Sequence, residues 1–102
     1  MTTTILPTLA RAPALETIKL SEAIREGAKL RPQCYGAFFR NGRSCALGAA
    51  YEYLTGDNDP CKCELTLISR YGTDIRNRVI YMNDGGLLTR ERIADMLEEE
   101  GL

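Results

Sequence analysis

The sequence predicts a mainly α protein, a compact single domain of about five short helices with one short β-hairpin near residues 35–44. Two patterns predict this class. Apolar residues recur every three to four positions in several stretches, as on one face of a helix, and glycines, prolines and turn residues separate these stretches. A short aromatic segment also precedes Asn41-Gly42, a pair typical of tight hairpin turns.

The length of 102 residues suits one domain with one hydrophobic core. We expect this domain to span residues 14–102. Residues 1–13 contain Pro7 and Pro13 and show no clear period, so they predict an N-terminal arm.

The first predicted helix runs from Ser21, as its cap, to Leu30. Its apolar stripe consists of Leu20, Ala23, Ile24, Gly27 and Ala28. Pro32 ends it, since the residue before a proline is disfavoured in helical conformation. Gly27 lies within the stripe, where it either allows a close contact with another helix or is simply tolerated near a helix end.

Residues 35–40 predict a brief strand or an extended loop. Ser44 then caps a second helix over Cys45 to Leu54, and Gly56 is suited to end it in the left-handed conformation. This helix is thin because it contains Ala46, Gly48, Ala49 and Ala50. We expect it at the centre of the fold, where another helix can approach its backbone.

The turn-rich residues 57–60 predict a loop that also contains Cys61 and Cys63, followed by a short helix over residues 64–71. Thr73 can cap the next helix, which extends through Met82. Residues 83–86, with the sequence Asn-Asp-Gly-Gly, predict a break in the chain.

The last helix begins at Thr89 as its cap, with Leu88 placed to form a hydrophobic staple with Ile93. The residues it is expected to bury are Ile93, Ala94 and Leu97. Its final glutamates, Glu98–Glu100, oppose the helix dipole, so we expect this end to fray unless a basic side chain lies beside it, which Arg40 or Arg43 could supply.

The chain contains no histidine, which excludes Cys-His and Ser-His nucleophile pairs and histidine-ligated catalytic zinc. We therefore expect no catalytic residues and no enzymatic activity. No apolar run reaches the length of a membrane span, and the start of the sequence lacks a secretory signal. These features predict a cytoplasmic protein without membrane contact, in which cysteines stay reduced.

The net charge of −1 is divided unevenly, at +4 over residues 1–43 and −5 over residues 44–102. The basic side chains that could contact a partner are Lys29, Arg31, Arg40 and Arg43, although charged runs are more often only solvated surface. The last helix carries a net charge of −3 over residues 89–100, which argues against DNA binding through it.

Four thiolates could hold zinc, and the chain has four cysteines, namely Cys34, Cys45, Cys61 and Cys63. The Cys-x-Cys spacing of the last two is shorter than structural zinc sites favour. Cys45 also begins a helix, where the dipole can lower the pKa of a nucleophilic thiol. The alternative for Cys45, which we favour, is an inert thiol packed among alanines.

Three blocks of the sequence carry a resemblance. They are Leu20–Gln33, Gly42–Ala50, and Met82–Asp84 together with Thr89–Asp95. In this order they resemble a family of small uncharacterised proteins from bacterial and phage genomes. In some members a Cys-x-x-Cys pair precedes the Asn-Asp block and a histidine follows it, which implies a zinc clip. Here the pair is Cys61-x-Cys63, and Gly86 occupies the histidine position.

These observations favour a non-enzymatic accessory protein of phage or mobile-element type that binds another protein and needs no cofactor. The residues 83 and 84 then have a structural role, as side chains that cap their own turn. One alternative is a zinc-stabilised binding domain that uses the cysteines. A second is a cysteine-dependent enzyme built on Cys45.

Overall fold

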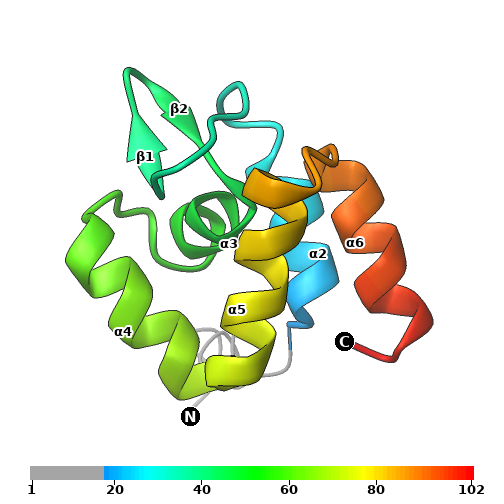
Figure 1. Cartoon of the computed structure of the whole chain (residues 1–102). Coiled ribbons are helices and arrows are strands. Elements are labelled where there is room, and N and C mark those ends of the chain that lie inside the picture. Colours follow the sequence, from blue (N-terminus) through cyan, green and yellow to red (C-terminus); the bar gives the residue numbers. More distant parts are fainter. Residues whose placement is uncertain (1–17) are drawn as a thin grey trace, which may run out of the picture.

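The computed structural model describes residues 18–102, so the predicted arm at residues 1–13 lies outside the described residues. It contains α2 (Leu20–Gly27), β1 (Phe39–Arg40), β2 (Arg43–Ser44), α3 (Ala46–Thr55), α4 (Pro60–Tyr71), α5 (Thr73–Ile80), the π-helical turn η1 (Tyr81–Gly85) and α6 (Arg90–Glu99). The expected mainly α class with one short hairpin is confirmed (Figure 1). None of the described helices is long and apolar enough to cross a membrane.

Helix α3 lies at the centre, surrounded by α2, the hairpin, α4 and α5 (Figure 1). Its small residues allow this, because Ala46, Ala49 and Ala50 are fully buried and leave room for neighbouring backbones. Gly48 faces the main chain of Phe38, and Gly27 of α2 faces the main chain of Ala49. The prediction of a central helix is therefore confirmed, and of the two alternatives for Gly27 the structure shows the close helix contact.

Helix α2 differs from the prediction at both ends. It begins at Leu20, with Lys19 in the capping position, and ends at Gly27. Ser21 does not cap it, because its hydroxyl lies in the first turn and donates to the Leu102 carbonyl at 2.8 Å. This bond fixes the C-terminal residue against the start of α2. A turn after Gly27 then leads to Pro32, the residue that was predicted to end this helix.

The hairpin pairs Phe39 with Ser44 around a turn in which Asn41 and Gly42 have φ values of 51° and 75°. The turn confirms the prediction from the Asn-Gly pair. Ser44 is thus a strand residue and does not cap α3. Cys45 holds that position instead, and its sulfur accepts a hydrogen bond from the Gly48 amide at 3.4 Å.

At its other end α3 follows the prediction, since Gly56 has a φ of 77° and ends the helix in the left-handed conformation. The next helix, α4, starts earlier than expected. Asp59 caps it by accepting from the amides of Cys61 and Lys62, and Pro60 occupies its first position. Cys61 and Cys63 therefore lie in the first turn of a helix, and their predicted loop position is wrong.

Helix α5 begins at Thr73 with Gly72 in the capping position, so the predicted Thr73 cap is wrong. The predicted break at residues 83–86 is present but begins later, at Gly86. The chain continues from α5 into η1 through Gly85, and the Gly86 amide donates to the Tyr81 carbonyl at 2.8 Å. The side chain of Asn83 is held by buried hydrogen bonds, described below, that keep these residues helical.

Helix α6 confirms the predicted cap at Thr89, whose hydroxyl accepts from the Arg92 amide at 3.1 Å. It buries the three predicted residues, Ile93, Ala94 and Leu97. The predicted basic neighbours of its C-terminal end are wrong. Arg25 of α2 pairs with Asp95 and Glu98 at 2.6 Å, and Arg78 of α5 pairs with Glu100. Arg40 and Arg43 lie on the hairpin.

Candidate binding site

The four cysteines do not form one set. Cys34, Cys45 and Cys63 are buried, whereas Cys61 is exposed at the start of α4. Over residues 18–102 the structure contains no group of three or more cysteine and acidic side chains that could hold a metal ion. Zinc binding therefore stays a prediction.

Burial determines the chemistry of Cys45. The Gly48 amide stabilises a thiolate at this helix start, as the sequence suggested, but desolvation is the larger effect and raises the pKa of Cys45 to about 11. Burial also raises the pKa of Cys34 and of Cys63. These thiols are protonated at neutral pH, and Cys34 donates to the Ala37 carbonyl at 3.3 Å.

The four basic residues expected at a partner surface are distributed over two regions. Arg31 forms a bidentate ion pair with Glu52 at 2.7–2.8 Å, and Lys29 pairs with Glu26 at 3.1 Å. Arg40 and Arg43 face each other across the hairpin and are exposed. Two of the four charges are therefore already neutralised within the chain.

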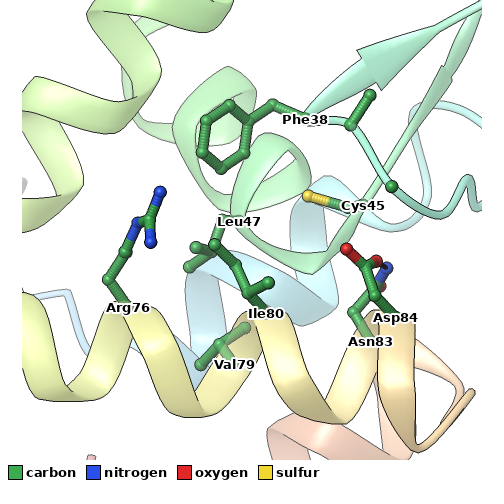
Figure 2. Close-up of a pocket in the computed structure, with 10 residues that line it drawn as sticks. Phe38, Cys45, Leu47, Arg76, Val79, Ile80, Asn83 and Asp84 are labelled. Carbon is green, nitrogen blue, oxygen red and sulfur yellow. Dashed lines mark hydrogen bonds between the residues drawn. The ribbon is translucent and has the colours of Figure 1, made fainter.

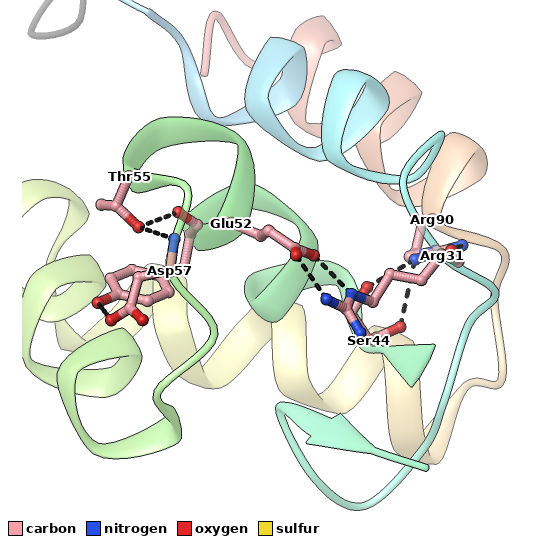
Figure 3. A network of polar contacts seen from close by, with 7 residues as sticks. Arg31, Ser44, Glu52, Thr55, Asp57 and Arg90 are labelled. Carbon is pink, nitrogen blue, oxygen red and sulfur yellow. Dashed lines mark hydrogen bonds and ion pairs between the residues drawn. The ribbon is translucent and has the colours of Figure 1, made fainter. Parts of the chain in front are cut away.

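A buried arginine connects three elements at the start of α6 (Figure 3). Arg90 is only 5% exposed, and one guanidinium nitrogen donates to the hydroxyl of Ser44 at 2.9 Å. The other donates to the carbonyls of Ala28 and Arg31 at 3.3 and 2.7 Å. These carbonyls follow the end of α2 and lack helical partners, so Arg90 supplies their hydrogen bonds. Burial lowers the pKa of Arg90.

Asn83 of η1 connects the hairpin region to α3. Its amide nitrogen donates to the Cys34 carbonyl at 3.0 Å and to the Asp84 carboxylate at 2.7 Å. Its amide oxygen accepts from the Ala46 amide at 3.1 Å and from Gln33 at 2.8 Å. The sequence had suggested that Asn83 caps its own turn. In the structure it caps the start of α3 instead.

Next to Asn83 the molecule carries a cleft of about 220 Å³ between the hairpin region and α5, here called the Phe38 cleft. Residues 36–38 form one wall and Cys45 and Leu47 of α3 form the base. The opposite wall consists of Arg76, Val79, Ile80, Asn83 and Asp84. In Figure 2 the ring of Phe38 lies above Leu47, with Arg76 at one end and Asp84 at the other.

The cleft combines an apolar centre with a carboxylate at one end and an ion-paired guanidinium at the other. Leu47 in its base and Val79 in its wall are buried, and Ile80 is half-buried. The guanidinium of Arg76 pairs with Glu64 of α4 at 2.8 Å, and its Nε hydrogen is buried without an acceptor among the described residues. Such a cleft can bind an apolar group, with the Asp84 carboxylate beside it as a hydrogen-bond acceptor.

A second hollow adjoins the cleft and shares Phe38 with it. It is lined by Phe38, Pro60, Cys61, Glu64 and Leu65, and its lining is mostly apolar. Leu65 is 71% exposed, which is as much as any large apolar side chain among residues 18–102. The apolar surface therefore continues from the cleft onto α4.

Among the residues that line this cleft, Cys45 alone stands out in the sequence as a candidate site residue. Phe38 was expected in a strand or loop, and Asp84 in a turn. Arg76 gave no signal, because it is one of two arginines on a short polar helix. The one available signal was the Asn-Asp pair at residues 83 and 84, which belongs to a block of the family resemblance.

Comparison of the chain with protein families, with curated proteins and with solved structures found no match.

Proposed function

We propose that this chain is a small non-enzymatic accessory protein that acts by binding another protein through the Phe38 cleft. The observation that carries the proposal is the continuous apolar surface of the cleft and of the hollow beside it. Its phage or mobile-element type is supported by the resemblance of the three sequence blocks.

Exposed apolar surface argues for a partner. Burying a large apolar side chain contributes about 1.5–3 kcal/mol, so a protein that leaves Leu65 in solvent forgoes that contribution when alone. Exposed apolar patches that adjoin a groove mark interaction sites more often than scattered single residues do. Leu65 and Phe38 line the same hollow and are therefore not scattered.

The chemistry of the cleft supports binding and not catalysis. The one nucleophile in its lining is Cys45, whose thiol is held protonated by burial. No histidine is available as a base. The remaining polar groups of the lining are an amide, a carboxylate and a guanidinium, which are suited to orient a bound segment.

The proposal is tested by affinity capture from the lysate of the source cells at several salt concentrations, with Leu65→Asp and Leu30→Asp as a matched pair. Both leucines are exposed, at 71% and 56%, and only Leu65 borders Phe38. We expect a reproducible partner that Leu30→Asp retains and Leu65→Asp loses. Capture of the same proteins by both variants would refute the proposed site.

A further inference from the structure

We propose that the Phe38 cleft receives a lysine side chain of the partner protein, with its methylene stem over the apolar base and its ammonium group at Asp84. This inference rests on the proposed function and names the residue by which the partner is recognised. Two observations carry it. One end of the cleft holds a carboxylate without a cation, and an apolar lining leads up to that carboxylate.

The acceptor for the ammonium group is the Asp84 carboxylate. It is half-buried, and it forms no ion pair with any lysine or arginine of residues 18–102. Its Oδ1 atom accepts from the Asn83 amide at 2.7 Å, whereas its Oδ2 atom has no hydrogen-bond donor within the described part of the chain. A carboxylate that is partly removed from water gains more from a cation than a fully exposed one does.

The surface next to this carboxylate suits the stem of a lysine. Leu47 in the base and Val79 in the wall are buried, and Ile80 is half-buried. The ring of Phe38 lies above Leu47, and Asp84 lies at the far end (Figure 2). Lysine side chains lay their methylene groups along apolar surface while the charged end stays at a polar group or in water. The cleft offers both surfaces side by side.

The guanidinium at the other end of the cleft does not oppose a cation at Asp84. Arg76 pairs with Glu64 at 2.8 Å, so its charge is already compensated within the chain. Arg76 and Asp84 are also eight positions apart along α5 and η1, which corresponds to roughly 12 Å of helical rise. This separation exceeds the Debye length of about 8 Å at physiological ionic strength, so the repulsion between Arg76 and the ammonium group is small.

The geometry favours lysine over arginine and over larger ligands. The planar fork of arginine bonds a carboxylate best through both oxygens, and Asn83 already occupies Oδ1. An ammonium group is a compact charge that needs only Oδ2. The cleft holds about 220 Å³, which is less than the roughly 300–1,000 Å³ of sites for drug-sized molecules and suits a single side chain.

The test is selection of peptides from a displayed random library on the immobilised full-length chain, compared with Asp84→Asn, Asp74→Asn and Leu65→Asp. Asp84→Asn removes the charge and keeps an oxygen acceptor for Asn83. Asp74→Asn is the matched control, because Asp74 is an exposed carboxylate on α5 that does not line the cleft. We expect the wild type and Asp74→Asn to enrich peptides with lysine at one position, and Asp84→Asn to lose this preference.

A selected peptide then tests the charge directly. Acetylation of its lysine keeps the stem and removes the charge. We expect acetylation to weaken binding to the wild type by about five-fold at low salt and to leave binding to Asp84→Asn unchanged. An equal loss on both proteins would show that the ammonium group binds elsewhere. Tighter binding of the same peptide with arginine in place of lysine would contradict the choice of lysine.

The outcomes separate this inference from the proposed function. Peptides that require Leu65 but show no lysine preference, or show the same preference on Asp84→Asn, would overturn the lysine site and leave the protein-binding cleft intact. No enrichment above the Leu65→Asp background would overturn both. Self-association of the chain that Leu65→Asp abolishes would assign the cleft to a second copy and also overturn the inference.

Discussion

Gly27 of α2 meets the main chain of Ala49 so closely that a Cβ atom at residue 27 would stand 1.8 Å from the Ala49 carbonyl oxygen. The two helices therefore touch backbone to backbone. The contact depends on the smallest residue in α2 and on the fully buried alanines of α3. It places α3 in the middle of the fold, where it can form the base of the Phe38 cleft.

We expect Gly27→Ala to destabilise the protein by about 3 kcal/mol, the upper end for overpacking, because the main chain of α3 cannot move aside locally. In an isolated helix the same change would stabilise by about 1 kcal/mol. The measurement is urea unfolding. Gly85→Ala is the control, because its Cβ would meet only the exposed ring of Tyr81, which can turn away. Equal effects of the two changes would contradict the backbone contact.

Asn83→Asp tests the hydrogen bonds that connect η1 to α3. The substitution preserves shape but replaces two donors by an acceptor that faces the Cys34 carbonyl and the Asp84 carboxylate. We expect a loss of about 3 kcal/mol in the free energy of unfolding at neutral pH. Asn77→Asp, an exposed change on α5, should cost little. A mild effect at residue 83 would mean that the network does not hold η1.

The helix faces could be predicted from the sequence because their apolar spacing is local. Several helix ends could not, because distant residues determine them. Ser21 resembles a cap, but its hydroxyl bonds to Leu102 at the other end of the chain. Residues 83–86 have the composition of a break, yet Asn83 bonds to Cys34 and Ala46 within η1, and the helical turn extends to Gly85 before the chain breaks at Gly86.

The candidate site was harder to predict for the same reason. Phe38, Arg76 and Asp84 come from two segments that are far apart in the sequence, and each belongs to a common residue type in an ordinary context. The cysteines attracted attention because they are chemically distinctive. Burial, which the sequence does not report directly, places Cys45 in the base of the cleft and raises the pKa of its thiol.

Arg90 should be essential for stability although it lies outside the Phe38 cleft. Arg90→Met would leave the carbonyls of Ala28 and Arg31 without donors, and we expect a loss of about 2–4 kcal/mol in unfolding free energy. Arg92→Met on the same helix is exposed and should be nearly neutral. The comparison by urea unfolding at fixed pH would contradict this role if both variants were equally stable.

The raised pKa of Cys45 predicts how stability changes in alkaline solution. The thiol has a pKa of about 11 when folded and about 9 when exposed, so the unfolded chain releases its proton first as the pH rises. The stabilisation that the buried, protonated thiol contributes to the free energy of unfolding is fully present below pH 9. It is lost as the pH approaches 11, and the loss is at most about 3 kcal/mol. Cys45→Ser keeps a helix cap and removes this titration, so the stability of this variant should fall less steeply over that range than that of the wild type.

Cys61→Ser, which changes an exposed thiol, should follow the wild-type curve. Urea unfolding at several pH values measures the slopes, and parallel curves for the wild type and Cys45→Ser would show that burial does not hold the proton on this thiol.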